Sequence, residues 1–327
     1  MQYRMTLGGS LVIAVALAGC GGAQTANAIP QTISAGTRAP AQRGAWMLPE
    51  AKDEILVYAT GLSRGGPGLK VHVYSYRSGK LVGLLTGLSD AAGACSDGSG
   101  NVFITNRYKV SSTYEYAHGG HDIIATYRAD SPVSCAWDPG TNSLAVCGSS
   151  VSIFKNEQAK RPTIYNPPIS PAYCTYDGNG NLFLDGGLSN GSLWELPKGS
   201  GSFISIAVDL SGPFGSLQWD GEYLALNVPT GKPDGSPATV YQLSVQGSQA
   251  SVVSKTLLYS ARGDTNYDVN CQMWIQNGAI LAGQRLFNRL AAWSYPGGGK
   301  PTKIFAPKPG LCGITVSVPP AGARFRE

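Results

Sequence analysis

The sequence predicts an all-β fold, a β-propeller of six four-stranded blades, and this prediction rests on three observations. A short motif returns about every 40 residues along the chain. Short segments rich in β-branched and aromatic residues alternate with turns, and the chain holds 43 glycines and 21 prolines. Hydrophobic residues make up 43% of the chain and charged residues only 14%, which is typical of a folded all-β domain rather than a disordered chain.

The repeated motif is a β-hairpin. In the clearest copies a short strand enters an Asp-x-x-Gly-Asn type turn and a second apolar strand leaves it. Asp accepts backbone N–H bonds in such a turn, while Gly and Asn tolerate positive φ. The copies lie at residues 93–105, 132–146, 171–185, 213–226, 270–282 and 310–318, and a turn-rich insertion at 229–237 lengthens one interval.

Further short β-rich segments lie between the hairpins, at residues 71–76, 121–127, 151–154, 192–196, 239–244 and 290–295. About four strands per 40 residues is the pattern of a propeller blade. A β-helix has a much shorter repeat and a β-sandwich has no fixed period of this length. We expect the terminal strand at 313–318 to join the blade begun by 54–59, because such closure protects the sheet edges.

The first 19 residues predict a lipoprotein signal peptide. Arg4 provides a positive charge, and the apolar run at 11–18 is too short to span a bilayer as a helix. The run ends in Leu-Ala-Gly-Cys at residues 17–20, which resembles the bacterial lipobox. We therefore expect cleavage before Cys20 and a lipid on its thiol, with an ordinary secretory signal as the alternative.

Residues 20–44 have the composition of a flexible tether, rich in Ala, Gly, Thr, Gln and Pro without an apolar period. The propeller then occupies 45–320 and a short tail 321–327. Gly21 follows the cysteine, and a residue other than Asp there resembles the pattern of outer-membrane sorting in Gram-negative cells. We expect a lipid-anchored protein of the cell envelope, facing the periplasm or the cell surface.

Six cysteines remain inside the predicted propeller: Cys95, Cys135, Cys147, Cys174, Cys271 and Cys312. In an exported protein they can oxidise to disulfides. Six thiols allow fifteen pairings, and the sequence does not choose among them. The alternative is that several are buried, unpaired thiols, which pack as small hydrophobic side chains.

Two copies of the motif, at 132–138 and 171–185, resemble the NHL-type blade pattern Pro-x-Gly-Ile-Ala-Val-Asp-x-x-Gly-Asn-Val-Tyr-Val-x-Asp, with cysteine at an apolar position. Residues 45–318 also resemble bacterial lipoproteins with a TolB-like six-bladed propeller, on segments 46–52, 74–82 and 115–120. The resemblance implies the fold. It does not imply one activity, because this architecture carries many unrelated functions.

The charge distribution and the spacing of possible metal ligands limit the kinds of molecule that this protein is expected to bind. The net charge is +5 and the basic residues are scattered, so we expect no nucleic-acid binding. His118, His121 and Asp122 lack a fourth ligand nearby in the sequence, and the Asp turns lack the spacing of a calcium loop. We expect no metal site, no cofactor and a monomeric protein whose membrane contact is the lipid on Cys20.

A ligand site is expected at one mouth of the propeller channel. In propellers the residues that end the second strand of each blade face this mouth. Amide and guanidinium groups suit hydrogen bonding to a polar or anionic ligand. The candidate residues are Asn106, Arg107, Asp185, Asn227, Gln284 and Arg285.

These features favour a membrane-anchored binding module for an unknown protein or polar small molecule, without catalysis. The alternative is an enzyme resembling gluconolactonases or streptogramin lyases, with its site at the channel mouth. No complete set of their catalytic residues matches this sequence. An Asp/Glu/His cluster at the mouth would favour the enzyme, and amides and aromatic rings would favour binding.

Overall fold

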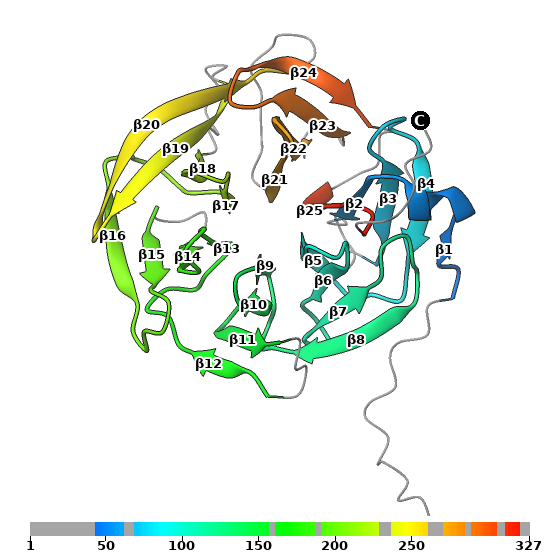
Figure 1. Cartoon of the computed structure of the whole chain (residues 1–327), viewed down its shortest axis with the longest axis horizontal. Helices are drawn as coiled ribbons and strands as arrows, with labels where there is room; N and C mark the ends of the chain where they lie inside the picture. Colours follow the sequence, from blue (N-terminus) through cyan, green and yellow to red (C-terminus); the bar gives the residue numbers. More distant parts are fainter. Residues whose placement is uncertain are drawn as a thin grey trace, which may run out of the picture. The chain divides into compact units, whose positions relative to one another are not determined.

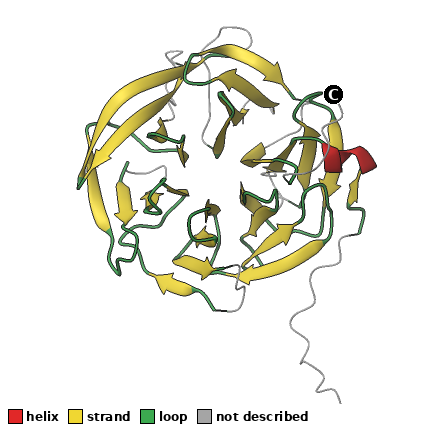
Figure 2. Ribbon diagram, in the orientation of Figure 1, coloured by secondary structure: helices red, strands yellow, loops and turns green. Residues whose placement is uncertain are grey.

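The computed structural model describes residues 43–61, 69–156, 161–186, 191–228, 237–260, 271–284, 289–305 and 311–320. Cys20, the apolar run before it and the predicted tether up to residue 42 lie outside these residues. Within them the chain forms β-strands joined by turns, plus the short 3-10 helix η1 (Pro49–Asp53) (Figure 2). No helix of this described part is long and apolar enough to cross a membrane.

The strands form antiparallel groups, here called blades 1 to 6, arranged in a ring (Figure 1). Blade 1 contains β1 (Trp46–Met47), β2 (Leu56–Gly61), β3 (Val71–Ser75), β4 (Leu81–Leu85) and β25 (Leu311–Ser317). Blade 2 contains β5 (Ala91–Ser96), β6 (Val102–Asn106), β7 (Ser112–Tyr116) and β8 (Ile123–Arg128). Blade 3 contains β9 (Ser134–Asp138), β10 (Ser143–Cys147), β11 (Val151–Lys155) and β12 (Thr163–Tyr165).

The second half of the chain repeats this arrangement. Blade 4 contains β13 (Cys174–Tyr176), β14 (Leu182–Asp185), β15 (Leu193–Leu196) and β16 (Ile204–Val208). Blade 5 contains β17 (Leu217–Trp219), β18 (Leu224–Val228), β19 (Ala238–Gln246) and β20 (Gln249–Leu258). Blade 6 contains β21 (Met273–Gln276), β22 (Ala279–Gln284), β23 (Arg289–Ser294) and β24 (Gly298–Ile304).

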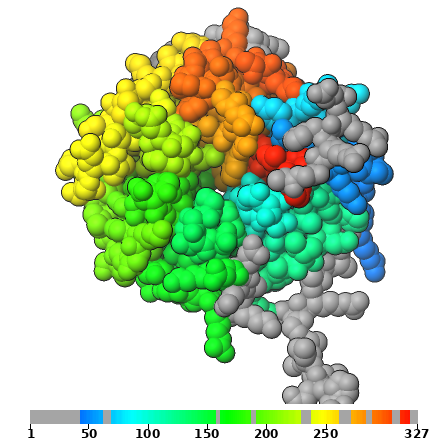
Figure 3. Space-filling view, in the orientation of Figure 1, coloured from blue at the N-terminus to red at the C-terminus, as the bar shows by residue number. Residues whose placement is uncertain are grey.

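The predicted closure of the ring by the C-terminal strand is confirmed. β25 pairs antiparallel with β2, in a register that joins Leu56 to Ser317 and Ala59 to Ile314. It is the innermost strand of blade 1, and the corresponding strands of the other blades are β5, β9, β13, β17 and β21 (Figure 1). In the space-filling view the red C-terminal segment lies against both orange and cyan segments (Figure 3). The last strand of the chain therefore completes the first blade and closes the ring.

The outer strands of blades 4, 5 and 6 also pair with one another. β16 pairs parallel with β20 at Ala207 and Gln249, and β20 pairs parallel with β24 at Leu258 and Gly299. These contacts merge three blades into one continuous 12-stranded sheet. Backbone hydrogen bonds between outer strands therefore join blade 4 to blade 5 and blade 5 to blade 6 at the rim of the ring.

The apolar core lies between neighbouring blades. Between blades 2 and 3, Phe103, Tyr127 and Phe154 are buried and pack edge to face, with ring centroids 5.8 Å and 5.2 Å apart in successive pairs. Such aromatic pairs add about 0.5–1.5 kcal/mol beyond the area that they bury. Each blade is stabilised mainly by the faces of its two neighbours.

The predicted Asp turns join the first and second strands of blades 2 and 4. Asp97 Oδ1 accepts hydrogen bonds from the backbone N–H groups of Ser99 and Asn101, at 2.9 Å and 2.7 Å, and Oδ2 accepts one from the Asn101 side chain at 2.8 Å. Asp177 makes the same three contacts in blade 4. Gly100 and Gly180 follow with φ of +86° and +85°, which is why glycine stands there.

All six cysteines of the domain form disulfides, so the expectation of oxidised pairs is confirmed. Cys95 bonds to Cys135, Cys147 to Cys174, and Cys271 to Cys312. Every bridge joins two neighbouring blades: 2 to 3, 3 to 4, and 6 to 1. The third bridge ties the C-terminal strand covalently to the last blade and so reinforces the closure of the ring.

Candidate functional site

The channel between the innermost strands holds a cavity of about 610 Å³. It lies at the end of the channel where the inner strands enter their hairpin turns. Its walls include residues of all six inner strands, among them Cys95, Cys135, Thr175, Gln218, Trp274 and Val316. Cavities of ~300–1,000 Å³ with such mixed walls are typical small-ligand sites.

Three tryptophans from three different blades line this cavity: Trp137 of β9, Trp219 of β17 and Trp274 of β21. All three are partly exposed. Trp137 stacks on Phe103 with a centroid distance of 5.7 Å and an interplanar angle of 12°, which fixes the orientation of its ring. Trp274 packs against the core between blades 6 and 1 and also against the core between blades 2 and 3. It therefore reaches across the channel.

Glutamine side chains complete the wall by pairing with the open edges of the inner strands. Gln218 Oε1 accepts a hydrogen bond from the Ile275 backbone N–H at 2.6 Å, and its Nε2 donates to the Ile275 carbonyl at 3.2 Å. Gln272 pairs in the same way with the backbone of Ala94, at 2.9 Å and 2.6 Å. These amides satisfy backbone groups that the channel would otherwise leave unpaired.

The acidic residues of the cavity wall, Asp97 and Asp177, are each bonded within the turn of their own blade. The phenol of Tyr176 also lines the cavity, and burial raises its pKa, as do the charges of Asp138 and Tyr165, so this phenol carries its proton. Within the described ranges, no three His, Cys, Asp or Glu side chains are placed to hold a metal ion. His118 is bonded through Nδ1 to Ser317 Oγ at 2.6 Å instead.

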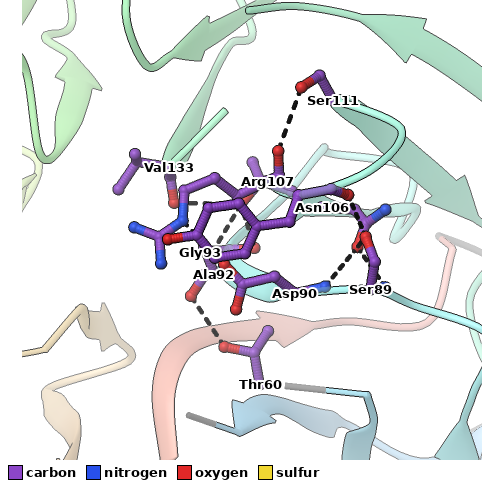
Figure 4. Close-up of polar contacts among 11 residues, drawn as sticks. Thr60, Ser89, Asp90, Ala92, Gly93, Asn106, Arg107, Ser111 and Val133 are labelled. Carbon is purple, nitrogen blue, oxygen red and sulfur yellow. Dashed lines mark hydrogen bonds and ion pairs between the residues drawn. The ribbon is translucent and has the colours of Figure 1, made fainter. Parts of the chain in front are cut away.

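The residues predicted from the sequence lie toward the other end of the channel. Asn106 ends β6 opposite Ala91, the first residue of β5. Its Oδ1 accepts hydrogen bonds from the backbone N–H groups of Ser89 and Asp90, at 2.7 Å and 2.8 Å (Figure 4). Because Asn106 is buried, its amide oxygen serves the loop that leads into the innermost strand.

Arg107 lies beside Asn106 and is the more accessible of the two. Its Nε donates to Asp90 Oδ2 at 2.8 Å (Figure 4). Its guanidinium lies 4.6 Å from the ring centroid of Tyr108. The Arg107 side chain is 32% exposed and the Asp90 side chain 4%. The ion pair thus neutralises a buried carboxylate while leaving part of the guanidinium at the surface.

The charges of Arg107 and Asp185 both affect the pKa of Tyr173. Burial raises the pKa of the Tyr173 phenol, the charge of Asp185 raises it further, and the charge of Arg107 lowers it. Asp185 is buried and its Oδ1 accepts a hydrogen bond from the Tyr173 backbone N–H at 2.9 Å. Two of the predicted residues, Arg107 of blade 2 and Asp185 of blade 4, thus shift the pKa of one phenol in opposite directions.

For two of the other predicted residues the structure shows how the backbone is paired. Asn227 is buried in β18, and its backbone bonds to Gly215 and Ser216 at 2.7 Å and 2.8 Å. Gln284 ends β22 opposite Arg289. Arg285 lies outside the described residues. The assignment of a ligand to these six residues stays a prediction.

Threonines in the second strands of blades 1 and 2 link each of these blades to the next. Thr60 Oγ1 donates to the carbonyl of Ala92 at 2.9 Å (Figure 4), and Thr105 Oγ1 donates to the carbonyl of Val133 at 3.1 Å. Each hydroxyl also accepts the N–H of an inner-strand glycine in its own blade, Gly313 or Gly93, at 2.7 Å. These two threonines thus stabilise the contacts of blade 1 with blade 2 and of blade 2 with blade 3.

The cavity tryptophans were not among the residues predicted for the site. A signal for them exists in the sequence, because an aromatic residue directly precedes the turn aspartate in three copies of the motif. These are Trp137, Tyr176 and Trp219, before Asp138, Asp177 and Asp220. Such an aromatic residue stands just before the hairpin turn of an innermost strand, and this position lies at the end of the channel.

Comparison with known proteins supports the fold and goes no further. No family model and no curated protein matches the chain. A chain in the crystal structure of a nidogen/laminin complex is similar, with a TM-score of 0.61 and 16% identity over 82% of this chain and 99% of that one. A putative 6-phosphogluconolactonase from Bacteroides fragilis has a TM-score of 0.53 and 9% identity, over 81% and 98%. At such identities the likeness shows a β-propeller fold alone.

Proposed function

We propose, with the β-propeller fold as the premise, that this protein is a membrane-tethered binding module of the cell envelope. In this proposal the domain is a six-bladed propeller, the mature chain begins at lipidated Cys20, and the central cavity holds a ligand or a segment of a partner protein. The propeller does not itself catalyse a reaction.

The composition of the cavity wall is the observation that supports this proposal. Indole rings and amide side chains provide contact area and hydrogen bonds, whereas acid–base chemistry needs carboxylates or imidazoles that converge on one point. The two wall aspartates belong to separate blades, and each carboxylate already accepts three hydrogen bonds within its turn. This arrangement suits binding better than turnover.

Export is supported by the cysteines. Three disulfides between blades are expected of a protein that folds in an oxidising compartment. A lipoprotein signal peptide would direct the chain out of the cytoplasm and into such a compartment. The tether of residues 20–44 would then leave the propeller free to meet its ligand.

A lactone hydrolase or a lyase remains the alternative function. The likeness to a putative 6-phosphogluconolactonase agrees with it at the level of fold. Such an enzyme would need its catalytic carboxylates or metal at a channel mouth, where the described part of this chain offers the Arg107–Asp90 pair and the Tyr173–Asp185 contact.

One experiment separates the two functions. The purified mature protein is titrated with neutral oligosaccharides, short peptides, organic anions and organic cations while tryptophan fluorescence is followed, and lactone hydrolysis is assayed with and without divalent metals. We expect saturable quenching by one ligand class and no turnover. Metal-dependent hydrolysis would establish the enzyme, and a cavity that responds to none of the four classes would refute the binding role.

A further inference from the structure

The charge of the cavity wall restricts the ligand. Among the described residues, the charged side chains that line the cavity are Asp97 and Asp177, and this described lining includes no lysine, arginine or histidine. A bound anion would meet carboxylates without a compensating cation, at an energetic cost that grows with burial. The ligand class that fits this wall is therefore neutral or cationic.

The tryptophans restrict its shape. Trp137, Trp219 and Trp274 present aromatic surface from blades 3, 5 and 6 around one cavity. The face of an indole carries partial negative charge and attracts C–H groups that carry partial positive charge. A pyranose ring has such C–H groups on its flat faces and hydroxyl groups around its edge, so it can stack on an indole and form hydrogen bonds at the same time.

Hydrogen-bond acceptors lie at the edge of the same cavity. Asp97 and Asp177 are held in matching turns, with both Oδ1 atoms bonded to two backbone N–H groups and each Oδ2 bonded to one asparagine side chain. A carboxylate oxygen has two lone pairs, so each Oδ2 can accept one further bond. Carboxylates fixed in this way pay little conformational entropy when they accept a sugar hydroxyl.

A single organic ammonium fits this cavity less well. Cation–π contact requires the ammonium within ~6 Å of a ring centroid. Here the three indoles stand on three blades around a volume of about 610 Å³, which is larger than a cage for one ammonium group. A ligand of several rings makes better use of the wall.

We propose that the central cavity binds the end of a short neutral oligosaccharide, whose ring faces stack on Trp219 and Trp274 and whose hydroxyl groups donate to Asp97 and Asp177. This inference rests on the proposed binding function and names its ligand class. It involves no bond making or breaking in the sugar.

The test uses isothermal titration and tryptophan fluorescence on the mature protein with maltotriose, cellotriose and chitotriose as probes. Tetramethylammonium chloride, citrate and trialanine represent the other ligand classes. We expect at least one trisaccharide to bind, with an affinity that stays constant between about 0.05 M and 0.5 M salt because the ligand is neutral. Tetramethylammonium binding would instead weaken across this range.

Variants locate the site. Trp219→Ala should weaken sugar binding about tenfold or more, because it removes an aromatic face on which a sugar ring stacks. Trp219→Phe should retain part of the affinity, because phenylalanine keeps a smaller aromatic face. Trp46→Ala is the matched control, since Trp46 lies on β1, is 37% exposed and does not line the cavity. Thermal unfolding of each variant shows whether the fold is kept, and Trp219→Phe keeps the test valid if Trp219→Ala unfolds.

The outcomes are distinct. If a peptide or tetramethylammonium binds the cavity and no trisaccharide does, the saccharide inference is wrong and the binding function stands. If Trp219→Phe and Trp219→Ala both bind the sugar as the unaltered protein does, the sugar site lies elsewhere and the inference is wrong. If no probe of any class binds, both the inference and the proposed function fail.

Discussion

The side-chain amide of Gln272 forms the two hydrogen bonds of a β-bridge with the backbone of Ala94, although 178 residues separate them in sequence. Gln272 lies at the start of blade 6 and Ala94 in the innermost strand of blade 2. Blade 1 lies between these two blades, and its strand β25 is next to the contact. The Ile314 N–H of β25 also approaches Gln272 Oε1, at 3.4 Å. One side chain thus connects blades 6, 1 and 2 at the point where the ring closes.

Replacing Gln272 should destabilise the closed ring. Both partner groups of Ala94 are buried, and Gln272→Ala would leave them without this partner at a cost of about 1–3 kcal/mol. Urea unfolding followed by circular dichroism measures the change. Gln249→Ala is the control, because Gln249 is exposed. Equal stability of the two variants would show that the bridge contributes nothing.

The disulfide between Cys271 and Cys312 should matter for stability because it fastens the C-terminal strand. Its loop spans 41 residues, and a loop of this length predicts a loss of about 4 kcal/mol in the Cys271→Ser, Cys312→Ser double variant by chain entropy. Thermal unfolding without reductant measures it. Peptide mapping of the unreduced protein should give the pairs 95–135, 147–174 and 271–312, and any other pairing would contradict the structure.

His118 should make stability depend on pH. Burial lowers the pKa of His118 below its usual value of 6.5, while the backbone of Glu54 and Lys52 and the charge of Asp53 oppose this shift. The unfolded chain then takes up the proton first as the solution is acidified, so the free energy of unfolding should decrease as the pH falls below about 6.5.

Urea unfolding at pH values between about 5 and 8 tests this expectation. His118→Gln should flatten the dependence because glutamine does not titrate. His121→Gln, at an exposed position in the same loop, should leave it unchanged. A His118→Gln protein with the original pH profile would show that another group is responsible.

Breaking the pair between Arg107 and Asp90 should be asymmetric. Arg107→Ala leaves the carboxylate of Asp90 buried and uncompensated, which should cost about 1–3 kcal/mol. Asp90→Asn leaves a cation that water can reach, so it should cost less. The double variant should be more stable than Arg107→Ala alone, as a double-mutant cycle by urea unfolding will show. Equal losses for the two single variants would argue against a buried charge at Asp90.

The proposed anchor at Cys20 is tested by fractionating cells. The protein should sediment with membranes and incorporate radiolabelled palmitate, because two or three acyl chains hold a protein firmly to a bilayer. Cys20→Ala should remove the label and release the chain into a soluble fraction or leave it unprocessed. Labelled Cys20→Ala protein would exclude Cys20 as the site of the lipid.

Much of the fold could be predicted because its causes are local. The Asp turns, the glycines at positive φ and the short β-rich segments act over a few residues, and their return about every 40 residues predicted the blades. The strand at 313–318 could be assigned to the first blade because closure of the ring by the last strand protects the sheet edges. The candidate site was harder, since Asn106 and Asp185 proved to be buried in loop contacts.

The cysteines show where local information ends. Cys135 and Cys174 both stand three residues before the turn aspartate, whereas Cys95 stands two before it. Because side chains alternate along a strand, this offset turns Cys95 to the opposite face of its blade. The sequence contains this offset. It does not show that the face of blade 2 that carries Cys95 packs against blade 3, which carries Cys135.

The sequence by itself determined the hairpin turns, the strands on either side of them and the repeat of about 40 residues, because each depends on neighbours along the chain. Only the tertiary structure decided which blade faces meet, which thiols pair, and that Trp137, Trp219 and Trp274 surround one cavity. These thiol pairs and tryptophans join residues that lie between 27 positions apart, for Cys147 and Cys174, and 137 positions apart, for Trp137 and Trp274. They exist only when the ring has closed, since closure brings the innermost strands of all blades to a common axis.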